Sequence, residues 1–144
     1  MAMTVKRAQL WVLDANDRAG LLADTLEPLA SAGATLRMLM AYRHPGQTDR
    51  AAIEVFPIKG KKAEAAARAA GMQPSLMACL VVEGDDRPGM GAQLGRAIAG
   101  AGISFTFMMG QVIGKKFSVA VGFANEQEAA AAAQAIKSSG KRRS

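Results

Sequence analysis

The stretch Asp86-Arg87-Pro88-Gly89-Met90, together with its counterpart Asp17-Arg18-Ala19-Gly20-Leu21, decides the fold predicted from this sequence. The two copies lie 69 positions apart, and the same interval separates Gly33 from Gly102 farther along the chain. Each copy follows a short apolar run rich in Val and Leu and precedes an apolar segment of helical period. That order is typical of a strand, a tight turn and a helix start. The sequence therefore predicts a duplicated unit with this turn at its functional centre.

The composition bounds the class of protein. The chain has 144 residues and an internal period of about half that length, which predicts two small domains, residues 1–73 and 74–144. Half of the residues are apolar and 21% are charged, as in globular rather than disordered proteins. The lone Cys79 excludes an intrachain disulfide. We expect a soluble cytoplasmic protein, because no apolar run approaches the ~18 residues of a membrane span and the start is unlike a signal peptide.

The net charge of +6 is spread over both halves. Residues 1–74 carry ten basic and seven acidic side chains, and residues 75–144 carry eight and five. Three of those last eight lie in the terminal tail, at Lys141, Arg142 and Arg143. Short terminal charge runs are usually solvated ends, so we expect no nucleic-acid partner.

The same order of elements is expected in both halves. In the first half, a helix carries Leu22, Leu26 and Leu29 on one face and ends at Gly33, and Pro28 should bend it. The remaining elements are predicted as strands over residues 9–14, 34–43, 50–58, 76–83, 103–113 and 117–124 and as helices over residues 61–70, 89–101 and 126–139.

Each half therefore reads β-α-β-β-α, the split βαβ plan of ferredoxin-like domains. This is an α+β fold with an antiparallel sheet and helices on one face. A full unit ends in a fourth strand, but few residues follow the last helix of either half, so that strand is predicted to be reduced or absent. The first strand of each unit then lies at a sheet edge, which must be covered. We expect the two halves, or two chains, to join their sheets, and we expect Asn125 to cap the last helix.

The second half resembles an ACT domain through Asp86-Arg87-Pro88-Gly89, Leu94, Ile98 and Gly102-Ile103. The first half resembles one through Asp17-Arg18-Ala19-Gly20, Leu26, Leu29 and Gly33-Ala34. As a tandem pair the resemblance covers nearly the whole chain, which is similar to proteins made only of paired ACT domains, such as the glycine cleavage repressor type. It implies a non-catalytic regulator that binds an amino acid between two domains, forms a homodimer and controls a metabolic enzyme or transcription through a protein partner.

The two turns are the predicted ligand-binding site. A helix start has unpaired N–H groups and a partial positive charge that together hold a carboxylate, and glycine permits close approach of the backbone. Asp17 and Asp86 have two possible roles, as helix caps or as acceptors for a ligand's ammonium group. The candidate ligand-binding residues of the turns are Asp17, Arg18, Gly20 and Leu21 in the first copy and Asp86, Arg87, Gly89 and Met90 in the second.

Two further residues are candidates by resemblance. ACT domains often place an Asn against the ligand at the start of the second strand, and Thr35 and Ser104 occupy the matching places with shorter side chains. Because Pro88 with Gly89 is the better match to the family, we expect the ligand at the Asp86 turn, while Ala19 weakens the first copy.

Other sequence signals point away from catalysis. Asp85 and Asp86 are adjacent carboxylates in a turn, where they splay apart, and His44 is expected to be a solvated turn residue with no second His for a zinc site. We predict no catalytic, metal or cofactor site.

Two alternatives stay open. One is a ligand-free interaction or dimerisation module. The other is an RNA-binding domain on the same plan, which needs exposed aromatic residues on its central strands. The aromatic candidates, which we expect to be buried, are Phe105, Phe107, Phe117 and Phe123.

Overall fold

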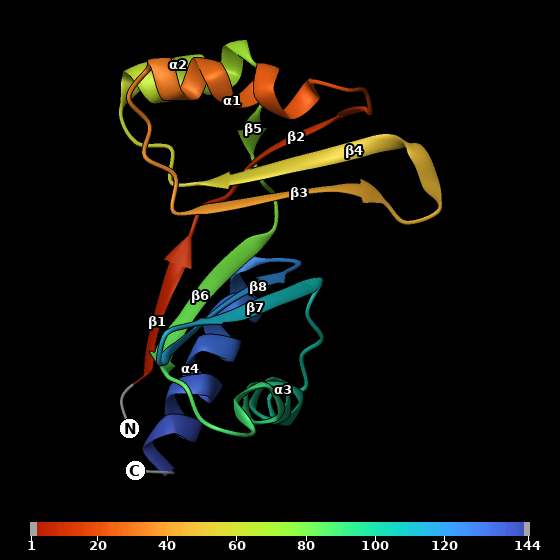
Figure 1. Ribbon diagram of the computed structural model, residues 1–144. Coiled ribbons are helices and arrows are strands. Elements are labelled where there is room, and N and C mark those ends of the chain that lie inside the picture. Colours follow the sequence, from red (N-terminus) through yellow and green to blue (C-terminus); the bar gives the residue numbers. More distant parts are fainter. Residues whose placement is uncertain (1–2, 143–144) are drawn as a thin grey trace. The chain divides into compact units, whose positions relative to one another are not determined.

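The computed structural model describes residues 3–142, with the side chains of residues 3–140 (Figure 1). The chain divides into two compact units. The first-repeat unit is Gln9–Ser75, and the second-repeat unit combines β1 (Met3–Ala8) with the chain from Leu76 onward. No helix in the described part of the chain is both long and apolar enough to cross a membrane.

The first-repeat unit is a ferredoxin-like fold. In chain order its elements are β2 (Trp11–Asn16), α1 (Leu21–Ser31), β3 (Met38–His44), β4 (Gln47–Phe56), α2 (Lys61–Ala69) and β5 (Gln73–Pro74). The strands pair in the order β3-β4-β2-β5, all antiparallel, and both helices cover one face of the sheet (Figure 1). The fourth strand is two residues long, so the prediction of a reduced fourth strand is confirmed for this unit.

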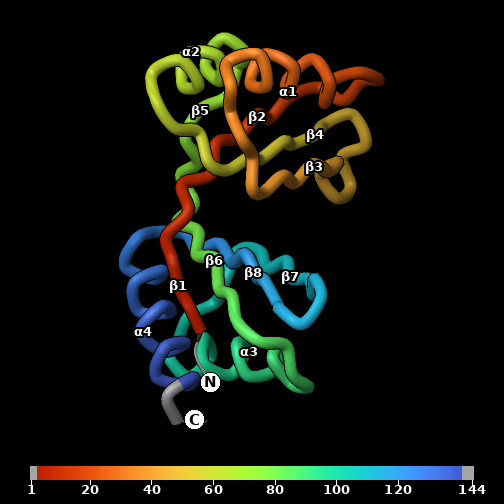
Figure 2. Tube along the Cα trace, turned by 60° about the vertical axis from the view of Figure 1, so that its left-hand side comes forward, coloured from red at the N-terminus to blue at the C-terminus, as the bar shows by residue number. Residues whose placement is uncertain are grey.

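The second-repeat unit repeats this plan with one exchange. Its elements after residue 76 are β6 (Ala78–Asp85), α3 (Met90–Gly100), β7 (Phe107–Ile113), β8 (Lys116–Phe123) and α4 (Glu126–Arg142). The strand order is β1-β6-β8-β7, so the start of the chain supplies the fourth strand, as Figures 1 and 2 show beside β6.

The pairing of β1 corrects two expectations. Residues 3–8 were placed in the first domain, but β1 runs antiparallel to β6 from Met3 opposite Gly84 to Ala8 opposite Cys79. The sequence also predicts that the two halves, or two chains, join their sheets, whereas the two described sheets of one chain are separate, with four strands each. The physical reason is that Met3 and Val5 pack against the apolar core of the second-repeat unit. The edge of β6 is thus covered from within the chain. Joining of sheets between two chains stays a prediction.

The two cores explain why these segments fold. In the first-repeat unit, Leu29 of α1 and Val55 of β4 are fully buried, and the small side chain of Ala67 brings α2 close to the sheet. In the second-repeat unit the largest buried side chains include Phe123 and Ile98. The predicted helices and strands are all present, with boundaries that differ by up to four residues.

Helix ends follow the predicted signals in most places. The Glu128 N–H donates to Asn125 Oδ1 at 2.9 Å, so the predicted cap of α4 is confirmed. Helices α1 and α3 end at the glycines expected, because the Ala34 N–H bonds to the Leu29 carbonyl and the Ile103 N–H to the Ile98 carbonyl. Pro28 lies inside α1, and its bending effect stays a prediction.

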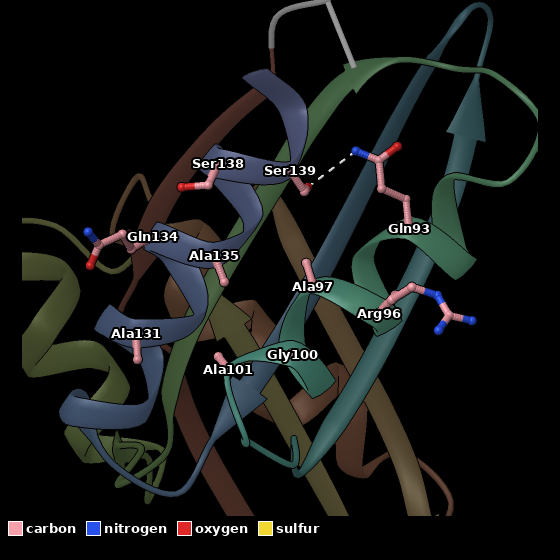
Figure 3. Close-up of a pocket in the computed structure, with 10 residues that line it drawn as sticks. All are labelled: Gln93, Arg96, Ala97, Gly100, Ala101, Ala131, Gln134, Ala135, Ser138 and Ser139. Carbon is pink, nitrogen blue, oxygen red and sulfur yellow. Dashed lines mark hydrogen bonds between the residues drawn. The ribbon is translucent and has the colours of Figure 1, made fainter. Parts of the chain in front are cut away.

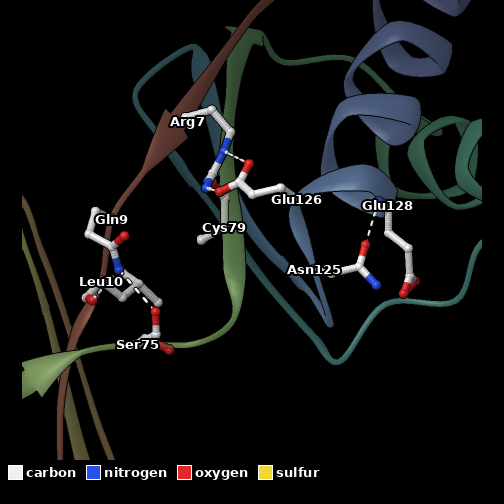
Figure 4. A network of polar contacts seen from close by, with 8 residues as sticks. All are labelled: Arg7, Gln9, Leu10, Ser75, Cys79, Asn125, Glu126 and Glu128. Carbon is white, nitrogen blue, oxygen red and sulfur yellow. Dashed lines mark hydrogen bonds and ion pairs between the residues drawn. The ribbon is translucent and has the colours of Figure 1, made fainter.

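Polar contacts hold the chain near its two passages between the units, at residues 8–9 and 75–76 (Figure 4). In the second-repeat unit the Arg7 guanidinium forms an ion pair with Glu126 and donates to the Cys79 carbonyl. In the first-repeat unit the Gln9 Nε2 donates to the Ser75 carbonyl at 3.1 Å, which closes the ends of that unit against each other.

Deletion of residues 1–8 is expected to destabilise the second-repeat unit by about 2 kcal/mol or more, because it uncovers the β6 edge and returns the apolar area of Met3, Val5 and Ala8 to water. Hydrogen exchange at the β6 amides, with calorimetric unfolding, measures the effect. The exposed substitution Lys6→Ala is the control. Unchanged protection of β6 in the deletion would contradict the pairing.

Candidate functional site

The two repeated turns have the same backbone geometry. In the first, the Asp17 N–H donates to the Asp49 carbonyl at 2.8 Å, and in the second the Asp86 N–H donates to the Lys115 carbonyl at 2.8 Å. Each of these bonds ties the turn to the hairpin of the same sheet. Gly20 and Gly89 then reverse the chain with φ of 88° and 87°, and α1 and α3 begin at the next residue. A side chain at either glycine would be strained.

The aspartate side chains do not cap the helices. Neither α1 nor α3 has a side-chain hydrogen bond at its N-cap, so the capping role considered for Asp17 and Asp86 is wrong. The Asp17 carboxylate instead accepts a hydrogen bond from Arg43 Nε of β3 at 2.7 Å. Within residues 3–140, no side chain pairs with the carboxylate of Asp86. The first turn of α1 and the first turn of α3 therefore each have backbone N–H groups that no side chain hydrogen-bonds.

The two arginines of the turns point to different partners. Arg18 pairs with Asp24, one turn into α1, at 2.8 Å. Arg87 donates to Gln93 Oε1 at 2.8 Å and contacts the sulfur of Met90. Thus Arg18 is held at the surface beside its helix start, whereas Arg87 is tied to a buried amide of α3.

Thr35 and Ser104 do not open the second strands. β3 begins at Met38 and β7 at Phe107, so both residues lie in exposed loops after the preceding helix. The expectation that they start those strands is wrong, because the chain leaves each helix through a left-handed glycine and needs several loop residues to reach the sheet. Neither residue borders the cavity described next.

A cavity of about 500 Å³ lies at the Asp17 turn. It extends from the turn along the first residues of α1 to the neighbouring strands β3 and β4. Four predicted site residues line it, and they are Asp17, Arg18, Gly20 and Leu21. The other lining residues are Leu22, Ala23, Ala41, Tyr42, Arg43, Ala51, Ala52 and Ile53. The first copy of the turn therefore brings its predicted residues together around a space of ligand size.

A groove of about 670 Å³ lies elsewhere, between α3 and α4 (Figure 3). Small residues line much of it, among them Ala97, Gly100, Ala131 and Ala135. At one end Gln93 donates to Ser139 Oγ at 3.3 Å, the contact drawn in Figure 3. Since Gln93 also accepts from Arg87, a chain of hydrogen bonds connects the Asp86 turn to α4.

A network of charged side chains crosses the first-repeat sheet. Asp14 of β2 accepts from both His44 of β3 and Arg50 of β4, and Arg50 also donates to Asn16 at 2.8 Å. These hydrogen bonds lower the pKa of the Asp14 carboxyl. His44, expected to be a solvated turn residue, is instead the last residue of β3 and is bonded to this network.

Glu54 is a buried carboxylate beside that network. Its side chain is 1% exposed, and Oε2 accepts from the Tyr42 hydroxyl at 3.0 Å, whereas Oε1 has no hydrogen-bond partner among the described residues. Burial raises the pKa of Glu54. Burial and the negative charge of Glu54 raise the pKa of Tyr42 to about 12. No group of three or more His, Cys, Asp or Glu side chains in the described part of the chain is arranged to hold a metal ion.

Comparisons with known proteins bear on the fold. No family model matches the chain, and no curated protein sequence matches it. Among solved structures, protein BT0572 from Bacteroides thetaiotaomicron is 15% identical, covers 90% of this chain and 88% of its own, and has a TM-score of 0.74. The regulatory subunit of aspartate kinase from Thermus thermophilus is 20% identical, with 96% and 97% covered and a TM-score of 0.65. That from Thermus flavus is also 20% identical, with 96% and 95% covered and a TM-score of 0.59.

The chain has the fold of two tandem ACT-type units. At these identities the likeness establishes the arrangement of helices and strands, and the predicted α+β class with two ferredoxin-like units is confirmed.

Sequence reasoning missed the strand side of the cavity. Arg43 lies on β3 and Ala51 on β4. They border the Asp17 turn only because of the strand register, which places Arg43 opposite Ala51 and Ala51 opposite Ala15. The alternation of apolar and polar residues along residues 34–43 indicated a strand there. No local sequence pattern shows which residue of a hairpin faces a turn that is distant in the sequence.

The expected burial of the four phenylalanines is only half right. Phe117 and Phe123 are buried in the core, as expected. Phe105 is 43% exposed in the loop before β7, and Phe107 is partly exposed.

Gly20→Ala and Gly89→Ala are each expected to lower the free energy of unfolding by about 1–2 kcal/mol, because both positions need a left-handed backbone. Urea unfolding measures the change. Gly91→Ala, at a helical position with open space around its Cα, is the matched control and should stabilise the protein by up to about 1 kcal/mol. Equal effects at Gly89 and Gly91 would contradict the turn geometry.

Glu54→Gln is expected to raise the melting temperature at pH 8, and the gain should shrink as the pH falls towards 4.5. The folded-state pKa of Glu54 lies above its ordinary value of 4.5, so the folded protein binds this proton more tightly than the unfolded chain does. The stability from this group is therefore complete below pH 4.5 and is lost as the pH rises through the folded pKa. Thermal melts of both proteins between pH 4 and 8 test this. A gain that is independent of pH would show that Glu54 does not titrate as described.

Proposed function

We propose that the protein is a non-catalytic regulator that senses an amino acid. It would act in the cytoplasm, as a homodimer, on a metabolic enzyme or on transcription through a protein partner. The observation that carries this proposal is the cavity at the Asp17 turn, which joins a helix start, a carboxylate and two arginines around a space of ligand size. The likeness of the fold to regulatory subunits of aspartate kinase and the resemblance to paired ACT domains of the glycine cleavage repressor type support it.

The turn offers a partner for each charge of an amino acid. Unpaired N–H groups at the start of α1 hold a carboxylate without a basic side chain, aided by the partial positive charge of the helix end. Arg18 adds a positive charge at the same edge. The Asp17 carboxylate, already bonded to Arg43, has a second oxygen for the ammonium group.

The Asp86 turn, which the sequence favours, stays a prediction. Its backbone matches that of the first turn, and its carboxylate has no side-chain partner within residues 3–140. With Arg87, Gly89 and Met90 it would hold the charged groups of an amino acid in the same way, beside the buried ring of Phe117. Regulation needs only that the ligand binds one state of the protein more tightly, by about 1–3 kcal/mol.

The alternative function, a ligand-free interaction module, is favoured by a different observation. Strand β7 is an edge strand of its sheet. Its residues Val112 and Ile113 are 51% and 69% exposed. An apolar edge strand pairs readily with another chain. This module needs no small molecule.

Thermal shift of the full chain against the twenty common amino acids separates these functions. A sensing protein is stabilised by at least one of them, by about 2.7 kcal/mol at a ligand concentration of 100 Kd. The D-enantiomers of the nineteen chiral amino acids, at the same concentrations, are the control, since a specific site binds one enantiomer more tightly than the other. No shift with any amino acid would contradict sensing and leave the interaction module.

A further inference from the structure

The two repeats differ at one strand position beside the turn. In the first-repeat sheet, Ala51 lies two residues after Asp49, whose carbonyl accepts from the Asp17 turn. In the second-repeat sheet, Phe117 lies two residues after Lys115, whose carbonyl accepts from the Asp86 turn. The same backbone bond therefore places Ala51 and Phe117 at corresponding positions.

Phe117 fills the space next to its turn. It is 3% exposed and belongs to the same apolar cluster as Met90 and Leu94 of α3. In the first-repeat unit a methyl group stands in its place, and the cavity of about 500 Å³ borders Ala51 and the first residues of α1. The residue that borders the cavity in the first repeat is thus smaller, by a whole aromatic ring, than its counterpart in the second.

The lining of this cavity divides by chemistry. Asp17, Arg18 and Arg43 gather at the turn, where the charged groups of an amino acid would bind. The part beside Ala51 is bordered by the apolar side chains of Leu22 and Ile53 and by Arg43, which lies opposite Ala51 and is paired with Asp17. A basic ligand side chain placed there would face Arg43, and an acidic one would compete with Asp17 for that arginine. An apolar side chain would instead bury area at about 25 cal/mol per Å².

We infer that the Asp17 cavity selects an α-amino acid with a bulky apolar side chain, such as leucine, isoleucine or phenylalanine. The inference rests on the proposed function and adds the class of ligand. The ligand's side chain takes the place beside Ala51 that Phe117 fills in the other repeat, and Ala51 is the residue that determines specificity.

Calorimetric titration of the full chain separates this inference from the proposed function. Leucine, isoleucine and phenylalanine are expected to bind at least tenfold more tightly than glycine, aspartate or lysine. Tighter binding of a small or charged amino acid would overturn the selectivity and leave amino-acid sensing in place. If no amino acid binds, both fail.

Ala51→Phe copies the second repeat into the first and is expected to weaken leucine binding at least tenfold. Leu22→Asp tests the same cavity from an exposed position of α1, so it decides the outcome if the first variant misfolds. Gly91→Asp is the matched control for Leu22→Asp, because Gly91 holds the corresponding position in α3. The control variant should bind leucine as tightly as the original chain. Leucine affinity equal to that of the original chain in Leu22→Asp, and in Ala51→Phe where that variant folds, would overturn the assignment.

Discussion

A backbone hydrogen bond from each turn to its own hairpin, followed by a left-handed glycine, is the constraint on which both repeats depend. The bond fixes where the strand ends, and Gly20 or Gly89 turns the chain back into a helix across the sheet. Side chains take little part in this geometry, so they are free to differ between the copies. The same frame therefore carries a cavity next to Ala51 in one unit and a buried ring at Phe117 in the other.

The fourth strand shows how a small repeat completes its sheet. A unit of this size has a marginal core, and an uncovered edge next to its first strand would expose backbone groups and apolar area. The first-repeat unit covers that edge with two residues of β5, and the second-repeat unit uses the six residues of β1. Because β1 precedes the first repeat in the chain, the two units are joined by two chain segments rather than one.

Local signals predicted most of the fold, because period, turn glycines and capping residues act over a few positions. The spacing of Asp17 and Asp86 indicated the duplication, and Asn125 marked the start of α4. The pairing of β1 and the contact of Arg43 with Asp17 could not be predicted, since both depend on register between distant segments. The sequence ranked the second turn first because Pro88 and Gly89 match the family better, and no local pattern indicated that a cavity at the first turn borders Ala51 of β4.

The most direct test of ligand binding at the Asp17 turn uses the two glycines as matched reporters. In protein labelled with ¹⁵N-glycine, the amide signals of Gly20 and Gly89 are followed by NMR as L-leucine is added. Binding at the first turn predicts a saturable shift of the Gly20 signal while Gly89, in the same backbone conformation, stays in place. Unchanged signals at both, or a shift at Gly89 alone, would contradict it.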